Sequence, residues 1–521
     1  MGIGIKAQTI DSSFAVNGMI PYGTTGNSQQ NLGVGNKMIT QPDGKILVAI
    51  DKMDPNGPTD LYFYTYRYNA DGTTDTTYGV GGASKIFTGT SSKNKDLKLQ
   101  PDGKIIVVGE SEYCIIGICG APQFVMMRIL PNGKVDSSFG TSGVVLSNDI
   151  FGNTGTYASP IRVQLTSNNK YIIAGKGPAY TQFIARLNSN GTKDNSFANN
   201  GIYLDSTVQA TMTDLITDAQ ENIYALYLKY SSPLDTMNYA DNYVLKLTAN
   251  GQPVTTFGTN GKVVMSVGND ERPSAIALRN DGKIVVVGTV RAFHYAYDVL
   301  DKGYVLILNQ NGSISNLLNG GSTLQKFAGD STTFFQSVTL TPNNEMLIGG
   351  NVTTKIAGNY HQKALLVLMK DDASLDNNFN ANGYLVLDHG LHAGIGSLAC
   401  ILDAHLLPNQ KIVCSGYRNP IAGNVKRSVY LFQLKNSGIG NASGIGNITS
   451  QEEILIFPNP SDGLFYFTEP ADRIEVYNVI GHMIYSANNS TQIDLSMSAM
   501  GVYFAHVFSN GKERIRKIIK E

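Results

Sequence analysis

The chain has little charge and no long apolar run. Only 16% of its 521 residues are charged and the formal net charge is −1, whereas typical domains are roughly 25% charged. A nearly neutral chain offers no electrostatic footprint for nucleic acid or an anionic membrane, so we expect neither as a partner. No stretch approaches the ~18 consecutive apolar residues of a membrane-spanning helix, so no transmembrane segment is expected.

Motifs that mark common catalytic and cofactor sites are also missing. The sequence contains no Gly-x-Ser-x-Gly elbow, no phosphate-binding loop and no paired zinc-ligand motif. The one close group of histidines, His389 and His392 with His405 beyond, lacks a supporting Cys or carboxylate pattern. Aspartates are abundant, but they fall in turns, where capping explains them. We therefore expect no metal and no cofactor, and no catalytic residue can be selected.

The chain does have many glycines (55) and tyrosines (27), and it has a repeated unit. An Asp-x-x-Phe-Gly-x-x-Gly-like signature returns at intervals close to sixty residues. Its aromatic position, with one leucine substitute, falls at Phe14, Tyr78, Phe139, Phe197, Phe257, Leu318 and Phe379. Such regular self-similarity indicates an array of one structural unit rather than several unrelated domains.

Each repeat reads as four short strands. In the clearest copy, Pro101-Asp102-Gly103 separates two apolar segments and predicts a β-hairpin, because Pro presets the turn and Gly takes its left-handed position. The segment 105–108 is apolar at every position, which indicates a strand buried on both faces. A third strand at 124–130, the signature and a short strand at 144–146 complete the unit. Four antiparallel strands in about sixty residues are typical of a propeller blade.

The two ends of the repeat region complement each other. The N-terminal segment supplies a signature and one strand (11–20) without a hairpin, while the last hairpin is followed by a strand at 429–434 and no signature. We infer that the first strand completes the last blade and closes the ring. The prediction is an all-β fold, a seven-bladed β-propeller of four-stranded antiparallel blades over residues 9–436.

The repeats resemble the delta-60 repeat family, whose members are taken to form β-propellers. The match covers about residues 9–436, with a degenerate sixth copy in which Ser315 and Leu318 replace Asp and Phe. The resemblance implies the fold and is nearly silent on activity.

An arginine precedes the signature aspartate by eight residues in three copies. The pairs are Arg67 and Asp75, Arg128 and Asp136, and Arg186 and Asp194. We expect these ion pairs to bridge the corner between strand and turn and to serve the scaffold. The fifth and seventh copies lack one partner, so the pair is not obligatory.

A second domain follows the repeats. Residues 437–451 are rich in Gly, Ser and Asn and indicate a flexible linker. Short strands with turn residues between them, over 452–521, predict a small Ig-like β-sandwich.

This second domain resembles the type A C-terminal sorting domain of the type IX secretion system. The positions that carry the resemblance are Pro458, Asn459, Pro460, Gly463, Tyr477, Asn478, Gly481, Asp494, Gly501, Tyr503, Lys517 and Lys520. The resemblance implies export across the outer membrane to the cell surface or the medium. The implied partners are the type IX translocon and its outer-membrane shuttle protein. An ordinary Ig-like module is the alternative.

Export bears on the N-terminus. Residues 1–8 then resemble the remnant of a signal peptide, with Ala7 as the small residue before the cut and a mature start at Gln8.

Export also bears on the four cysteines, because an oxidising compartment permits disulfides. Cys114 and Cys119 are a candidate pair that would close a tight loop. Cys400 and Cys414 are not, because pairing Pro408 with Lys411 places Cys414 opposite His405 and Cys400 about 17 Å further along at ~3.3 Å per residue. We expect Cys414 to be a buried apolar filler.

Aromatic residues outside the repeat pattern are the best functional lead. Phe293, His294, Tyr295 and Tyr297 lie in an extended loop between strands and form a candidate ligand-contact loop. Alternatively, their rings cover the blade rim.

Two main function classes remain open, beside a third in which the propeller is a structural partner of the secretion or motility machinery. The first is an exported, monomeric binding or adhesion module for a glycan or surface protein, with a role in a surface or gliding apparatus. The second is an enzyme acting on polysaccharide in the propeller channel. An enzyme predicts clustered carboxylates or His with raised pKa values at the channel.

Overall fold

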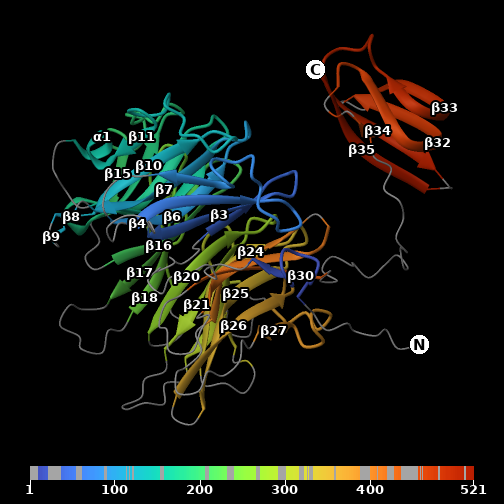
Figure 1. Ribbon diagram of the computed structural model, residues 1–521. Coiled ribbons are helices and arrows are strands. Elements are labelled where there is room, and N and C mark those ends of the chain that lie inside the picture. Colours follow the sequence, from blue (N-terminus) through green and yellow to red (C-terminus); the bar gives the residue numbers. More distant parts are fainter. Residues whose placement is uncertain are drawn as a thin grey trace. The chain divides into compact units, whose positions relative to one another are not determined.

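A computed structural model gives the fold of the chain (Figure 1). It describes residues 10–20, 37–53, 61–86, 91–112, 114–115, 118–119, 122–152, 158–205, 210–230, 240–265, 270–291, 301–315, 322–325, 327, 332–356, 359–387, 399–407, 409–418, 428–435, 456–457, 459, 461–478, 482–509 and 512–521. The chain divides into two compact units, residues 1–441 and 442–521, and each is described by itself.

Strands of the first unit form antiparallel groups of four. The first two groups are β2 (Lys37–Thr40), β3 (Ile46–Met53), β4 (Leu61–Tyr68) and β5 (Ala83–Ile86), then β6 (Ser91–Leu99), β7 (Ile105–Glu112), β10 (Gln123–Ile129) and β11 (Val144–Leu146). A single parallel pairing, Leu61 with Ser91, joins these two groups into an eight-stranded sheet.

Four more groups follow as separate sheets in chain order. They are β12 (Ser159–Leu165), β13 (Tyr171–Lys176), β14 (Gln182–Leu187) and β15 (Ile202–Asp205); β16 (Ala210–Thr217), β17 (Ile223–Tyr230), β18 (Ala240–Leu247) and β19 (Lys262–Met265); β20 (Glu271–Leu278), β21 (Ile284–Val290), β22 (Lys302–Leu308) and β23 (Ser322–Gln325); and β24 (Thr332–Leu340), β25 (Met346–Ile356), β26 (Asn359–Met369) and β27 (Tyr384–Leu387). Three small elements lie between strands: the hairpin β8 (Cys114–Ile115) and β9 (Ile118–Cys119), the helix α1 (Ser147–Phe151) and the 3-10 helix η1 (Pro178–Tyr180).

The last group combines both ends of the repeat region. It contains β28 (Ala399–Leu406), β29 (Ile412–Arg418), β30 (Ser428–Leu434) and the N-terminal β1 (Met19–Ile20). Strand β1 pairs antiparallel with β30, so that Met19 faces Phe432. The first unit is therefore all-β and built from four-stranded antiparallel groups, as expected for a β-propeller.

The hairpin turns explain how the first two strands of a group meet. At Pro101-Asp102-Gly103 the backbone N–H of Gln100 donates to the Lys104 carbonyl at 2.7 Å, and Gly103 adopts a φ of +80°. The Asp102 carboxylate accepts the Lys104 backbone N–H at 3.1 Å. Asp102 therefore caps the turn and Gly103 takes its left-handed position, as the sequence predicts.

The second strand of each group is buried on both faces. Side chains Ile105 and Val107 pack with Leu47 of the preceding group, and Val108 packs with Tyr171 of the following one. All of these side chains are fully buried. An unbroken apolar strand is therefore required, since neighbouring groups cover both of its faces.

Signature residues join one group to the next. The Phe139 ring is fully buried, and the backbone N–H of Gly140 donates to the Asn190 carbonyl of the next repeat at 2.8 Å. The register in the last group corrects one expectation: Cys414 faces Ala404 rather than His405. The hairpin closes at Leu407, whose N–H bonds Lys411, one residue earlier than predicted.

The second unit contains one five-stranded sheet. Its strands are β31 (Ile456–Phe457), β32 (Leu464–Asn478), β33 (Met483–Asp494), β34 (Gly501–Ser509) and β35 (Lys512–Lys520), with the order β31-β32-β34-β35 and β33 paired to β32. Its core includes Phe465, Ile474, Val476 and Val507. Among the described residues of both units, no helix is long and apolar enough to cross a membrane.

Candidate functional site

The Arg–Asp ion pairs that recur in three repeats serve the scaffold. Arg128 Nε donates to Asp136 Oδ2 at 2.8 Å, and Arg128 Nη1 donates to the Ser189 carbonyl of the next repeat at 2.7 Å. Burial alone raises the pKa of Asp136, but hydrogen bonds from Ser138 and the Arg128 charge bring it below its ordinary value. Arg67 with Asp75 and Arg186 with Asp194 make the same contacts at 2.7 and 2.6 Å. These groups are engaged in holding the turns, which leaves function to residues outside the signature.

A cavity of about 660 Å³ lies where the first strands of the groups meet. Its lining comes from β2, β6, β12, β16, β20, β24 and β28, and we call it the axial cavity. In six of these strands a register shift precedes one lining residue, for example between Asn94 and Asp96. The residues at this position, together with the equivalent one of β2, are Lys37, Asp96, Arg162, Asp214, Ala275, Ser337 and Asp403.

The carboxylates of the axial cavity hold neighbouring groups together. Asp96 Oδ2 accepts the Val163 backbone N–H at 3.0 Å, and Asp214 Oδ2 accepts that of Ile276 at 3.0 Å. Asp403 Oδ2 accepts the Met38 N–H at 3.3 Å, which joins the last group to the first. Each acid therefore binds a backbone amide of another group.

Two side chains complete the Asp403 contacts. His405 Nε2 lies 3.3 Å from Asp403 Oδ1, and Lys37 Nζ lies 4.0 Å from Oδ2. Burial raises the pKa of Asp403, but the charges and hydrogen bonds of Lys37 and His405 hold it well below its ordinary value. A carboxyl with a lowered pKa stays ionised and is unsuited to general acid catalysis near neutral pH.

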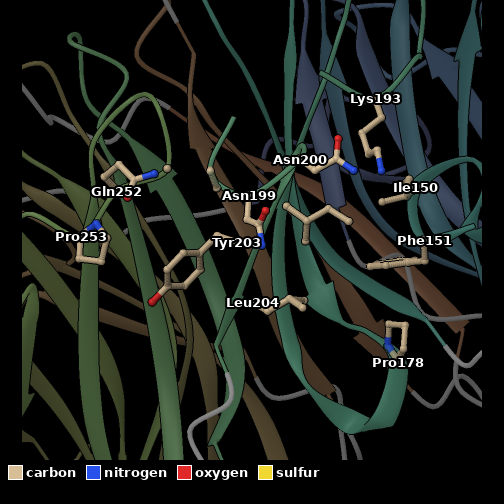
Figure 2. A pocket seen from close by; sticks show the side chains of 13 residues that line it. Ile150, Phe151, Pro178, Lys193, Asn199, Asn200, Tyr203, Leu204, Gln252 and Pro253 are labelled. Atoms are coloured by element: carbon tan, nitrogen blue, oxygen red, sulfur yellow. The ribbon is translucent and has the colours of Figure 1, made fainter. Parts of the chain in front are cut away.

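A second hollow, of about 730 Å³, straddles the edge strand β15; we call it the outer groove (Figure 2). Its lining comes from α1, from η1, from the segment 193–204 and from the turn 251–253 of the next group. Successive strand residues point to opposite faces. Accordingly, Tyr203 points toward Gln252 and Pro253, whereas Leu204 lies on the side of Phe151.

The outer groove combines apolar surface with neutral hydrogen-bonding groups. Leu204 is 53% exposed, and Phe151 is held edge-on against Phe183 with ring centroids 5.0 Å apart. Burial and the charge of Asp205 raise the pKa of Tyr203 to about 12, so its hydroxyl remains a donor. The carboxamides of the lining are Asn199, Asn200 and Gln252, and its one cation is Lys193. Among the described residues of this lining there is no Asp, Glu or His.

Several predicted site residues cannot be placed. The candidate contact loop of Phe293, His294, Tyr295 and Tyr297 lies outside the described residues, as does Gln8. Sequence reasoning missed the outer groove and the axial cavity. A signal for the axial cavity was available, because five of its charged residues (Lys37, Asp96, Arg162, Asp214 and Asp403) occupy one register position of the first strand.

The cysteines divide into two pairs. The backbones of Cys114 and Cys119 are directly opposite each other in the hairpin β8–β9, and their side chains are outside the description. Cys400 and Cys414 are not bonded to each other, and Cys414 is buried, as predicted. Among the described residues no group of three or more His, Cys, Asp or Glu is arranged to hold a metal ion.

Motif residues of the second unit gather around its chain end. The Asn459 side chain donates to the Lys517 carbonyl at 2.8 Å and accepts the Ile519 N–H at 2.9 Å, as a neighbouring strand would. Lys520 Nζ donates to the carbonyls of Ser496 and Ser498 at 2.6 and 2.5 Å. The start, the third motif and the basic end of this unit are thus tied together.

Other motif residues shape turns. Gly463 has a φ of +131° and donates its N–H to the Ser461 hydroxyl at 3.1 Å. Asn478 faces Tyr503 across β32 and β34, and the Tyr503 hydroxyl donates to the Ala499 carbonyl at 2.5 Å. Asp494 accepts the Ser496 N–H at 2.8 Å, and Gly501 has a φ of +152°. Pro458, Pro460 and Gly481 lie outside the described residues.

Two family models match the chain. Residues 41–78, 100–139 and 166–197 match a domain of unknown function, DUF5122, described as a beta-propeller. Residues 455–521 match the secretion system C-terminal sorting domain. The chain carries delta-60-type propeller repeats and a type IX sorting domain. Both resemblances are confirmed, and the sorting domain indicates export to the cell surface or the extracellular space.

Solved structures offer only distant likenesses. The polysaccharide lyase Uly1 is 10% identical, with a TM-score of 0.44 over 77% of this chain and 90% of that one. Raptor from Chaetomium thermophilum is 9% identical, with a TM-score of 0.40 over 77% of this chain and 29% of that one. Levansucrase from Bacillus subtilis is 9% identical, with a TM-score of 0.29 over 60% of this chain and 93% of that one. These scores carry no argument about activity. No curated protein sequence matches the chain.

Proposed function

We propose that this exported protein is a glycan-binding module that attaches to neutral carbohydrate chains outside the cell, in the outer groove. The observation that carries the proposal is the composition of that groove, in which Tyr203 and three carboxamides surround apolar surface. Sites for small ligands are concave and mostly apolar with a few placed polar groups. Tyr and Pro faces suit the C–H faces of a sugar ring, and carboxamides both donate to and accept from its hydroxyls.

The scaffold of the proposal is a closed seven-bladed ring followed by a small sandwich. Pairing of β1 with β30 supports closure, as does the 2.6 Å contact between Lys411 Nζ and Asp11 Oδ2. Lys45 makes the matching contact to Asp75 within a single group, at 3.2 Å. The aspartate of the N-terminal signature thus binds the hairpin lysine of the last group, as Asp75 binds the hairpin lysine of its own group. The sorting domain delivers this ring through the type IX translocon, with an outer-membrane shuttle protein as its receptor.

Glycan binding is tested with the full-length protein and immobilised neutral oligosaccharides, followed by calorimetry with the strongest one. Replacing Tyr203 with Ala should weaken binding at least tenfold, which corresponds to about 1.4 kcal/mol. Leu204→Ala should weaken it less. Val264→Ala is the matched control, because Val264 holds in β19 the position of Leu204 in β15 and is 67% exposed outside the groove. Equal binding by all three variants would refute the groove as the site.

An extracellular enzyme acting on polysaccharide is the second candidate. The contact between His405 and Asp403, in a cavity that also contains Asp96 and Asp214, is the observation that favours it. The lowered pKa of Asp403 and its bond to the Met38 amide weigh against it. Release of reducing or unsaturated ends that disappears in His405→Gln would support the enzyme over the binding module.

A further inference from the structure

The charged side chains of the axial cavity have more hydrogen-bond donors available than acceptors. Every carboxylate oxygen at its charged position already accepts a bond: Asp96 from the Leu97 and Val163 amides, Asp214 from Arg162 and from the Leu215 and Ile276 amides, and Asp403 from Met38 and His405. Their charges are therefore committed to joining neighbouring groups.

The cations are less fully engaged. Arg162 uses Nε for Asp214 and Nη1 for the Ile161 carbonyl, and within the described part of the chain Nη2 has no partner. Lys37 has only its long, 4.0 Å contact with Asp403 there. Lys98 lines the cavity, is half-buried and forms no ion pair with any residue that the structure describes. A guanidinium and an ammonium have five and three N–H donors and no acceptor, so spare donors remain.

Ser337 adds a neutral group on another side of the cavity. Its side chain is buried, with 4% of the residue exposed, and its hydroxyl has no hydrogen-bond partner among the described residues. A buried polar group without a partner costs free energy unless something in the site satisfies it. Ser337 and Ala275 of the neighbouring group have small neutral side chains where the other groups have Lys, Arg or Asp, which leaves room beside them.

We propose that the axial cavity binds a small hydroxylated carboxylate of the sugar-acid class. Its carboxylate is held by Lys98 with Lys37 and Arg162, and one of its hydroxyls is held by Ser337. Anion binding matches the surplus of donors, and the small side chains on the Ser337 side accommodate the body of the ligand. This site is separate from the outer groove, with which it shares no lining residue.

Calorimetry of the full-length protein with sodium glucuronate tests the proposal, with glucose as the uncharged comparison. Glucuronate should bind at least tenfold more tightly than glucose. Lys98→Gln should weaken glucuronate binding about tenfold, and Ser337→Ala should weaken it several-fold without changing the overall fold. Lys134→Gln, at an exposed turn of the same sheet, is the matched control and should bind normally.

The outcomes also separate this site from the proposed glycan site. Tyr203→Ala should leave glucuronate binding unchanged. Absence of glucuronate binding at millimolar concentration would overturn the proposal, as would equal affinity for glucuronate and glucose. Unchanged affinity in both Lys98→Gln and Ser337→Ala would overturn it as well, whatever the result with neutral glycans.

Discussion

The contact between Asp11 and Lys411 joins the N-terminal signature to the last group of strands, and its removal should open that junction. Asp11 Oδ2 lies 2.6 Å from Lys411 Nζ, and Oδ1 accepts the Ser13 hydroxyl at 2.6 Å. The Asp11 backbone N–H donates to the Gln433 carbonyl at 2.8 Å. Asp11→Asn keeps the size of the side chain and removes its charge.

The size of the effect follows from the pKa of Asp11. Burial alone raises this pKa, but bonds from Lys411 and Ser13 bring it from 3.8 to about 2. A difference of about 2 units corresponds to a stabilisation of about 2.5 kcal/mol by the ionised form, at ~1.36 kcal/mol per unit. Because Lys411 is one-third exposed, part of this is screened. We expect Asp11→Asn to lower the free energy of unfolding by about 2 kcal/mol at pH 7.

The pH dependence has a definite sign. A folded-state pKa below the unfolded value gives stability that is present above the unfolded pKa and is lost as pH falls through the folded pKa. The difference between wild type and Asp11→Asn should therefore be full above about pH 5 and shrink between about pH 4 and 2. Urea unfolding at a series of pH values measures it.

Hydrogen exchange locates the effect. In Asp11→Asn the amides of Met19 and Ile20 in β1 should exchange faster, because β1 loses its anchor to β30. Asp136→Asn is the control: it removes a signature carboxylate from the interior of the array and should leave exchange in β1 unchanged. The reasoning is refuted if both variants speed exchange in β1 equally, or if the Asp11→Asn deficit is as large at pH 2 as at pH 7.

Three further predictions test other parts of the chain. Gly133→Ala should cost over ~2 kcal/mol in thermal unfolding, because φ is +85° and a Cβ would lie 2.4 Å from the Gly79 nitrogen; an unchanged melting temperature would contradict this. Cys114 and Cys119 should form a disulfide in the exported protein, since their backbones are directly opposite; peptide mapping without reductant should find the linked peptides, and alkylation of both thiols would argue otherwise. Lys520→Gln should destabilise the sorting domain by about 1.5–3 kcal/mol through loss of two charged hydrogen bonds and should reduce the secreted fraction; normal secretion of a destabilised domain would separate folding from sorting.

The sequence predicts the strands well because local chemistry determines them. Gly103 is required by its turn, and the aromatic residue at the position of Phe139 is buried in every repeat where it is described. Arg128 and Asp136 are predictable as a pair because their spacing is constant. The predicted cross-strand partner of Cys414 is wrong by one residue. The pair that closes a loose turn depends on backbone hydrogen bonds that the residue types do not specify. The sequence pattern therefore predicts that the strand exists but not which residues it pairs with.

Neither candidate site was predicted from the sequence, and the reason differs from that for the strand register. The outer groove takes Phe151, Tyr203 and Gln252 from three successive repeats, and no single repeat contains a recognisable motif. The axial cavity is lined by the first strands of seven repeats, and the chemistry there depends on how Lys98 and Ser337 differ from their equivalents. Function in such an array therefore depends on departures from the repeat. Because the two linings share no residue, Tyr203→Ala and Ser337→Ala should act independently, and coupling between them would show that one ligand spans both.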